Sequence, residues 1–257
     1  MLLAVDVGNS QTHIGVFAGR ELAHEWRART EPRRTPDELA LLFGQFLELA
    51  GLSFSREITG VVISSVVPRA TKNLRDMTHD YFGFAPVVVE PKTKSGIDVT
   101  AYTNPVGADR LANAVGAHER WPGESVVVVD FGTAITVDAI SAEGKFLGGA
   151  IAPGVEAAAT ALYASTALIP PVELKGPDAA VGTSTARGVE SGIVFGTAAL
   201  TDGLVDRIVS EIGGGARVVA TGGSAALIVE HCRRIETVDP TLTLTGLRVI
   251  YDRNAGR

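Results

Sequence analysis

The pattern of hydrophobic and polar positions predicts short strands that alternate with helices. The β-branched runs at 60–68 (GVVISSVVP) and 85–90 (APVVVE) end in turn residues or charge, which is typical of buried strands. At 35–51 the apolar residues recur at helical spacing, with Thr35 as N-cap, Pro36 in the first turn and Gly51 as the stop. The chain therefore reads as an α/β protein.

Further elements follow the same rules in the second half. Helices are expected at 108–120, 154–164 and 185–211. The segment 216–232 (ARVVATGGSAALIVEHC) predicts a strand, a glycine turn and a helix that carries Cys232.

One short unit occurs twice. LAVDVGNSQTHIGVF at 3–17 has an echo at 127–141, VVVDFGTAITVDAIS, about half a chain later. Both copies read apolar, Asp, any residue, Gly and then a small polar residue, so that Asp6 corresponds to Asp130. A lone Asp-x-Gly is a common turn after a strand. Two copies near the start and the midpoint instead predict two similar domains, each led by a β-hairpin.

The repeat sets the expected domain division. The boundary is placed near 118–125 (HERWPGES), which gives an N-terminal domain at 1–120 and a C-terminal domain at 121–257. The two hairpins are expected to face each other across a nucleotide cleft.

Composition narrows the function classes. The chain has 257 residues, a formal charge of −6 and 46% hydrophobic residues, which is enough for a real core. The acidic balance argues against nucleic acid as a partner, and the basic stretch at 27–34 (RARTEPRR) is interpreted as a solvated loop. No apolar run is long enough to span a membrane. A single cysteine, Cys232, excludes an intrachain disulfide, so a cytoplasmic protein is expected.

The hairpins carry the candidate chemistry. An Asp at a strand end followed by Gly leaves backbone N–H groups pointing into one concavity, which attracts phosphate oxygens. Asn9, Ser10 and Thr133 add side-chain donors. The carboxylates of Asp6 and Asp130 would repel a polyphosphate unless cations lie between them. Mg²⁺, which uses one or two carboxylates plus phosphate oxygens, is the expected metal.

Other candidate sites are weaker. The five histidines have no spacing that converges on a metal, so a zinc site is not expected. Ser64 and Ser65 lack the glycine elbow of a hydrolase nucleophile. Cys232 is interpreted as a buried or incidental thiol.

Several motifs together resemble known proteins. The paired hairpins, followed by VVATGGSAAL at 218–227, are similar to the phosphate and adenosine motifs of the acetate and sugar kinase, heat-shock ATPase and actin superfamily. Within it the chain resembles the type III pantothenate kinase family, in order and over almost its whole length. The motifs that carry this resemblance are DVGNS at 6–10, SSVVP at 64–68, NPVGADR at 104–110, VVDFGTAITVD at 128–138, GGAIAPG at 148–154 and DPTLTLTGL at 239–247.

The resemblance implies a fold and a reaction. It implies two ribonuclease-H-like domains, use of ATP and Mg²⁺, a monovalent cation (K⁺ or NH₄⁺), and a homodimer with the pantothenate sites near its interface. The implied reaction moves the γ-phosphoryl group of ATP to pantothenate and gives 4′-phosphopantothenate, at the entry to coenzyme A synthesis.

The resemblance also assigns roles residue by residue. It makes Asp109 the catalytic base, Asp130 the ligand of the monovalent cation and Asp6 an indirect Mg²⁺ ligand. The implied ATP contacts are Asp6, Val7, Gly8, Asn9, Ser10, Gln11, Thr12, His13 and Thr133. The implied pantothenate contacts are Tyr102, Gly107, Ala108, Asp109, Arg110 and Thr185, the last of which is reached across the dimer.

The sequence departs from the family pattern at two positions. Tyr102 lies about two residues closer to Gly107 than the family's pantothenate-contacting tyrosine does, and other members lack that tyrosine. Ser10 stands where Thr is usual, and the hydroxyl is kept.

Alternatives stay open at this stage. Asp109 would serve as a plain helix cap and Arg110 as a surface ion-pair partner if the segment were structural. The chain would act as another kinase or phosphatase of the superfamily, or as a non-catalytic ATP-binding protein, if pantothenate were not its substrate.

Overall fold

The computed structural model describes residues 1–54 and 56–255, which divide into two compact units. The first unit holds Met1–Ile97, Thr103–Arg120 and the chain from Leu242 onward; the second holds Asp98–Tyr102 and Trp121–Thr241. The expected ranges 1–120 and 121–257 differ from these units in two segments. Residues 98–102 group with the second unit, and the C-terminal helix groups with the first.

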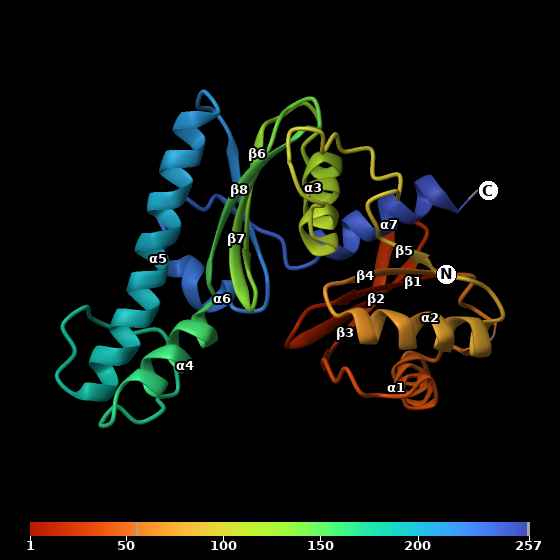
Figure 1. Cartoon of the computed structure of the whole chain (residues 1–257), viewed down its shortest axis with the longest axis horizontal. Coiled ribbons are helices and arrows are strands. Elements are labelled where there is room, and N and C mark those ends of the chain that lie inside the picture. The colour runs from red at the N-terminus through yellow and green to blue at the C-terminus, as the bar shows by residue number, and fades with distance from the viewer. Residues whose placement is uncertain (55, 256–257) are drawn as a thin grey trace. The chain divides into compact units, whose positions relative to one another are not determined.

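The first unit is built on a mixed five-stranded sheet in the order β3-β2-β1-β4-β5 (Figure 1). β1 pairs antiparallel with β2 and parallel with β4. The strands are β1 (Leu2–Val7), β2 (Gln11–Ala18), β3 (Glu21–Arg29), β4 (Gly60–Ser65) and β5 (Val87–Val88). The hairpin expected at the N-terminus is therefore confirmed as β1 and β2.

Helices α1 (Pro36–Leu49) and α2 (Pro68–Phe82) cover one face of this sheet. α1 starts at Thr35 through a complete capping box: Glu38 N–H donates to the Thr35 hydroxyl, and Thr35 N–H donates to the Glu38 carboxylate. Its buried residue Phe43 packs in the same core as Val5 of β1 and Leu74 of α2. The predicted helix and its cap are confirmed.

Helices α3 (Ala108–Arg120) and α7 (Leu242–Asn254) lie on the opposite face. α7 contacts β1, β2 and β4 as well as α3. Two strand glycines allow this close approach, because a Cβ on Gly15 would lie 2.8 Å from Leu244 Cδ1 and one on Gly60 would overlap the Tyr251 ring. The C-terminal helix is thus an internal support of the first unit.

The second unit repeats the sheet in the order β10-β9-β6-β7-β8. β6 pairs antiparallel with β7 and parallel with β9, as β1 does with β2 and β4. The strands are β6 (Val126–Phe131), β7 (Ala134–Ile140), β8 (Phe146–Pro153), β9 (Arg217–Thr221) and β10 (Thr237–Val238). The echo in the sequence is therefore a repeat in three dimensions.

One face of the second sheet is covered by helices of the same unit. Val129, Val137 and Ala220 form a buried core with Val194 and Ala198 of the long helix α5. The helical elements of this unit are α4 (Val155–Ser165), α5 (Thr185–Glu211), α6 (Ala225–Ile228) and a 3₁₀ turn η1 (Val229–His231). The helices expected at 108–120, 154–164 and 185–211 are confirmed within one residue.

Three local predictions need correction. The stretch 27–34 is not all loop, because β3 continues to Arg29 as an edge strand with alternating exposed side chains. The strand expected at 85–90 shrinks to two residues. The helix expected to carry Cys232 ends earlier: Asp202 accepts backbone N–H groups of Arg233 and Arg234, which holds the chain after the 3₁₀ turn out of helical register.

Candidate active site

The first hairpin turn connects β1 to β2 through Gly8, Asn9 and Ser10. Gly8 N–H donates to Gln11 O at 2.9 Å and closes the turn. Asn9 and Ser10 are exposed, while Asp6 is half-buried one residue before the end of β1. The turn therefore presents its polar side chains outward, as a phosphate-binding turn requires, and a partly shielded carboxylate lies beside it.

The two faces of the hairpin separate the predicted ATP contacts. Asp6 lies directly opposite His13 in the β1–β2 ladder, and both side chains are on the face turned to α7. Val7 is buried in the core under α1 and α2, and its side chain is not available to a nucleotide. Thr12 points to that same face, where its hydroxyl meets the hydroxyl of Thr30 at 2.9 Å.

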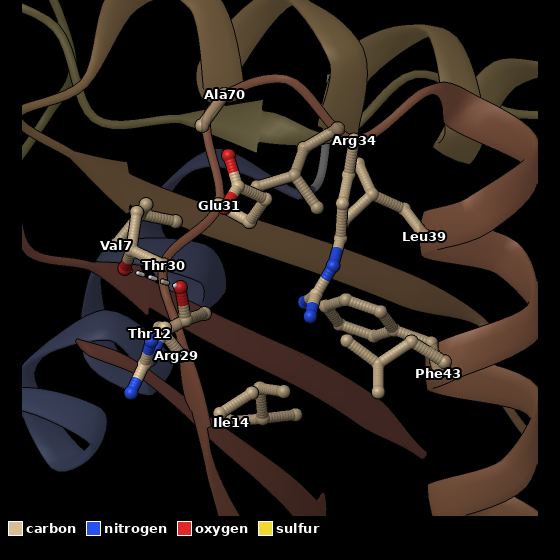
Figure 2. Close-up of a pocket in the computed structure, with 13 residues that line it drawn as sticks. Val7, Thr12, Ile14, Arg29, Thr30, Glu31, Arg34, Leu39, Phe43 and Ala70 are labelled. Atoms are coloured by element: carbon tan, nitrogen blue, oxygen red, sulfur yellow. Dashed lines mark hydrogen bonds between the residues drawn. The ribbon is translucent and has the colours of Figure 1, made fainter. Parts of the chain in front are cut away.

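A small pocket opens on this second face, between the hairpin and α1 (Figure 2). The cavity itself is small, with a volume of about 20 Å³, and it opens to solvent. Apolar side chains form its floor and the segment 29–34 forms its rim. The residues that line it are Val7, Thr12, Ile14, Ala28, Arg29, Thr30, Glu31, Arg34, Leu39, Leu42, Phe43, Ala70 and Leu74.

His13 has an unusual environment for a surface hairpin. Its side chain is buried, and Nε2 lies 2.9 Å from a carboxylate oxygen of Glu25 on β3. Burial, assisted by the positive charge of Arg27, lowers the pKa of His13, although the Glu25 contact opposes that shift. His13 is therefore neutral at neutral pH, beside Asp6 in the ladder.

Asp109 lies in the first turn of α3. The helix begins at Ala108, and Leu111 N–H donates to Gly107 O at 2.9 Å, so the cap is the backbone of Gly107. The Asp109 carboxylate accepts the N–H of Arg110 at 2.8 Å. A Cβ on residue 107 would lie 2.7 Å from Asp109 Oδ1, so glycine leaves room for the carboxylate there.

These positions argue against the alternative in which Asp109 is only a helix cap and Arg110 only a surface ion-pair partner. Asp109 is inside the helix and not at its cap position. Arg110 is buried, with 8% of its surface exposed, so it is not a partner in a surface ion pair. A buried arginine beside a half-exposed carboxylate at a helix N-terminus is suited to binding an anionic substrate.

α3 is fixed against α7 along its whole length. The Thr243 hydroxyl donates to Asn113 Oδ1 at 2.6 Å in the buried interface, and Arg248 forms an ion pair with Glu119 at 3.2 Å. The helices cross at a glycine, because a Cβ on Gly246 would overlap the carbonyl oxygen of Ala112. The motif DPTLTLTGL, for which the sequence alone predicted no role, thus supplies the surface on which α3 packs.

The second hairpin resembles the first, but its turn between the two strands is one residue shorter. Gly132 N–H donates to Ala134 O at 3.2 Å, and Thr133 is exposed at the tip. Asp130 is half-buried and lies opposite Thr136 on one side and Thr221 on the other. The turn geometry therefore offers backbone donors and a carboxylate in the same order as the first hairpin.

The glycine turn after β9 packs against this hairpin. Gly222 has a φ of +96°, and a Cβ there would overlap Asp130 Oδ1 and the backbone of Phe131. Ser224 N–H donates to Phe131 O at 3.0 Å. The TGG motif is thus in direct contact with the end of the Asp130 strand.

The second hairpin is also held from its other side by Gly154. Gly154 follows β8, caps α4 and donates its N–H to Thr133 O at 3.1 Å. A Cβ at this position would overlap the carbonyl oxygens of both Gly132 and Thr133. Gly154 is the last residue of the motif GGAIAPG, for which the sequence alone predicted no contact.

Tyr102 and Thr185 lie elsewhere in the second unit. Tyr102 packs edge-on against Phe146 of β8, with 5.4 Å between ring centroids. Thr185 is exposed at the first position of α5, in an open groove with Leu162 of α4. Leu162 is about two helical turns, or roughly 10 Å, along α4 from the end that touches the second hairpin.

The predicted site residues therefore fall into two sets. The first unit contains Asp6, Val7, Gly8, Asn9, Ser10, Gln11, Thr12, His13, Gly107, Ala108, Asp109 and Arg110. The second unit contains Tyr102, Asp130, Thr133 and Thr185. Sequence reasoning missed Thr30, whose signal was masked by the basic residues around it, and Thr243, whose partner is 130 residues away.

Solved structures share the fold at low sequence identity. The chain matches the ethanolamine utilization protein EutJ of Carboxydothermus hydrogenoformans with a TM-score of 0.59 and 13% identity, over 96% of this chain and 89% of that one. It matches the inorganic polyphosphate/ATP-glucomannokinase of Arthrobacter sp. strain KM with a TM-score of 0.51 and 16% identity, over 99% and 98%. The fold and the paired hairpins define an α/β protein of the actin-like fold class, with two ribonuclease-H-like units.

Within that class the family is specific. The chain belongs to the type III pantothenate kinase family, whose model matches residues 2–207. It is 47% identical to type III pantothenate kinase 2 of Symbiobacterium thermophilum, over 99% of this chain and 97% of that protein. It is 45% identical to the type III pantothenate kinase of Moorella thermoacetica, over 99% and 100%.

Proposed function

We propose that the protein transfers the γ-phosphoryl group of ATP to the primary hydroxyl of pantothenate and forms 4′-phosphopantothenate, the first step of coenzyme A biosynthesis. The observation that carries this proposal is the full-length likeness to relatives that bear this enzyme name. The matched region includes both hairpins and the Asp109 helix. In the reaction the pantothenate oxygen forms a bond to γ-phosphorus, the bond to the β,γ-bridging oxygen breaks, and ADP leaves.

The two hairpins bind the phosphates of ATP in this proposal. Backbone N–H groups of the turn residues other than Gly8 and Gly132, whose N–H groups close the turns, act as donors, with the hydroxyls of Ser10 and Thr133 beside them. Support comes from the exposure of Asn9, Ser10 and Thr133 and from the closed backbone geometry of both turns. Val7 and Thr12 contribute through the backbone, since their side chains face away from Asp6.

Asp109 accepts the proton of the pantothenate hydroxyl. Its carboxylate accepts the Arg110 N–H through Oδ1, which orients the side chain in the first turn of α3. Phosphoryl transfer has a loose transition state in which positioning and charge neutralisation dominate, so a base is expected to contribute roughly 10²- to 10⁴-fold. Gly107, Ala108 and Arg110 hold the pantothenate, with the guanidinium of Arg110 on its carboxylate.

Mg²⁺ accompanies ATP and is held chiefly by phosphate oxygens, with Asp6 in its outer shell. Among residues 1–54 and 56–255, no group of three or more His, Cys, Asp or Glu side chains is placed to hold a metal ion. The proposed donors, one carboxylate from Asp6 and the phosphate oxygens of ATP, fit Mg²⁺, which keeps much of its water and takes one or two carboxylates plus substrate phosphates. When bound, the ion neutralises charge on the β- and γ-phosphates.

A monovalent cation, K⁺ or NH₄⁺, is held by Asp130. Support comes from the half-buried carboxylate of Asp130, one residue before the end of β6, and from its ladder neighbour Thr221, which offers a hydroxyl oxygen. Oxygen donors of this kind suit a hard monovalent ion.

Tyr102 and Thr185 complete the pantothenate contacts in a homodimer, with Thr185 supplied by the second protomer. Thr185 is exposed at the first position of α5, which supports a role toward a neighbouring protomer. α5 also exposes Gly188, Gly192 and Gly196 at four-residue spacing, and a Cβ on each would meet nothing within 4 Å. Light scattering on the purified protein tests the dimer.

We place the reaction in the cytoplasm. The single cysteine, Cys232, has its pKa raised to about 12 by burial and by the nearby Asp202 carboxylate, so its thiol stays protonated at neutral pH. None of the described helices combines the length and the apolar character needed to cross a membrane.

The deciding experiment measures pantothenate-dependent ADP release with ATP and Mg²⁺ in parallel K⁺, NH₄⁺ and Na⁺ buffers. Turnover with K⁺ or NH₄⁺ and a sharp drop with Na⁺ are expected. Turnover that is equal in all three buffers would remove the cation role from Asp130. ADP release with a sugar but not with pantothenate would favour another kinase of the same class.

A further inference from the structure

Thr30 is the residue that follows the last ladder pair of β2 and β3. Its backbone N–H donates to Ser10 O at 3.0 Å, and its hydroxyl meets the Thr12 hydroxyl at 2.9 Å (Figure 2). One residue therefore contacts both the turn and the first part of β2. Ser10 and Thr12 belong to the candidate phosphate hairpin, but Thr30 comes from the next strand.

Thr30 is itself fixed from the other side. The chain after it turns, with Arg34 N–H donating to Glu31 O at 3.1 Å, and the Arg34 carbonyl accepts the Asn73 side chain of α2 at 2.7 Å. α1 starts directly afterwards at its Thr35 cap. The segment that follows Thr30 is thus anchored to α1 and α2, while Thr30 itself is buried, with 8% of its surface exposed.

The contact with Ser10 controls the orientation of one peptide group. In a trans peptide the carbonyl and the next N–H point in opposite directions. Because the Ser10 carbonyl is held by Thr30 toward β3, the N–H of Gln11 points away from β3 and into the turn. A turn that binds phosphate through backbone N–H groups depends on this orientation.

The second hairpin has the same support in a different form. Gly154 follows β8 as Thr30 follows β3, and its N–H holds the Thr133 carbonyl at 3.1 Å. The next N–H, that of Ala134, is thereby turned into the second hairpin. Gly154 has no side chain to add a second bond, whereas Thr30 has the hydroxyl pair with Thr12.

We propose that Thr30 is a positioning residue for the first phosphate-binding turn, which rests on the proposed use of ATP. The backbone bond orients the Ser10–Gln11 peptide, and the hydroxyl pair with Thr12 keeps the two strands in register next to it. The Thr12–Thr30 pair lies at the edge of an apolar pocket, where loss of one hydroxyl leaves the other less well satisfied.

The test replaces Thr30→Val, which removes the hydroxyl and keeps the shape and the backbone N–H. The KM for ATP and the Kd for a non-hydrolysable ATP analogue are expected to rise about fivefold, the factor that corresponds to one hydrogen bond. The KM for pantothenate and kcat at saturating ATP should change less than about twofold. Thr30→Ser, which restores the hydroxyl, should return the KM for ATP to near the wild-type value.

The matched control is Thr78→Val on α2. Thr78 is fully buried in the same unit, and its hydroxyl donates to Leu74 O at 2.7 Å, away from the hairpin. If both valine variants lower thermal stability but neither changes ATP affinity, Thr30 is merely structural and the proposal is overturned. If Thr30→Val does not fold, Thr12→Val removes the other hydroxyl of the pair. A rise of about fivefold in the Kd for the analogue then supports the positioning role, and an unchanged Kd overturns it.

The Kd for the ATP analogue distinguishes a failure of this proposal from a failure of the proposed function. If the wild-type protein binds the ATP analogue but does not phosphorylate pantothenate, the substrate assignment fails and the Kd of Thr30→Val still tests the positioning role. If wild-type turnover is normal and the Kd for the analogue is the same in Thr30→Val, the positioning role fails alone.

Discussion

Thr30 and Gly154 make the same contact in the two halves of the chain. Each follows the third strand of its sheet and donates its N–H to a carbonyl of the hairpin turn, Ser10 O at 3.0 Å and Thr133 O at 3.1 Å. The internal repeat therefore extends beyond the Asp-x-Gly signature to the residues that support each turn. Only the first position accepts a side chain, since a Cβ on Gly154 would overlap two carbonyl oxygens.

Gly154→Ala is expected to damage the second hairpin. The new methyl group would overlap the carbonyl oxygens of Gly132 and Thr133, and backbone cannot move aside as a flexible side chain does. We expect kcat/KM for ATP to fall at least about tenfold, measured at saturating pantothenate. Gly203→Ala on α5, where a Cβ meets nothing within 4 Å, is the matched control and should leave kcat/KM unchanged. Equal behaviour of the two variants would contradict the account of Gly154.

Asp109→Asn is expected to separate chemistry from nucleotide binding. The amide keeps the shape of the side chain but cannot accept the hydroxyl proton, so turnover should fall at least about a hundredfold. The Kd for ATP by calorimetry should stay within about twofold of wild type. Asp80→Asn, an exposed carboxylate on α2, serves as the control. Turnover close to wild type in Asp109→Asn would remove Asp109 from the role of base.

Gly246→Ala tests the support of α3 by α7. A methyl group at the helix crossing would press on the Ala112 carbonyl and push the Asp109 helix outward. Because misplacement of a reacting group by about 1 Å can cost on the order of 10²-fold, we expect kcat to fall more than tenfold. Gly203→Ala on α5, with open space around its Cβ, should leave kcat unchanged. A loss of thermal stability with unchanged kcat would show that α7 supports the fold and not the site.

His13 predicts a pH dependence of stability. Because its pKa is lowered in the folded protein, the unfolded chain takes up a proton first as the pH falls below the ordinary histidine value of about 6.5. Stability is therefore complete above that value and is lost as the pH falls toward the lowered pKa. Urea denaturation at pH 7.5 and 5.5 should show a smaller loss for His13→Gln than for wild type. The same loss in both proteins would contradict the buried neutral state of His13.

Much of the fold could be predicted from local pattern. The repeated Asp-x-Gly motif predicted both hairpins, because the strand end, the glycine and the small polar residues of each turn are adjacent in the sequence. The Thr35 cap and Gly51 stop fixed α1 for the same reason. Local chemistry of this kind is visible in a single sequence.

The remainder depended on partners far apart in the chain. Nothing in DPTLTLTGL signals that Gly246 packs on Ala112 or that α7 returns to the first unit. The end of the helix before Cys232 is set by Asp202, which lies some thirty residues upstream on α5. Thr30 was hidden in a basic stretch that resembled a solvated loop, although its contacts are with the hairpin.

The measurement that tests the central claim most directly is mass spectrometry of the products formed from ATP and pantothenate with Mg²⁺ and K⁺. The account predicts pantothenate that carries one phosphoryl group, in equal amount to the ADP formed, with product formation reduced at least about a hundredfold in Asp109→Asn. ADP formed without phosphorylated pantothenate, or equal product from wild type and Asp109→Asn, would contradict it.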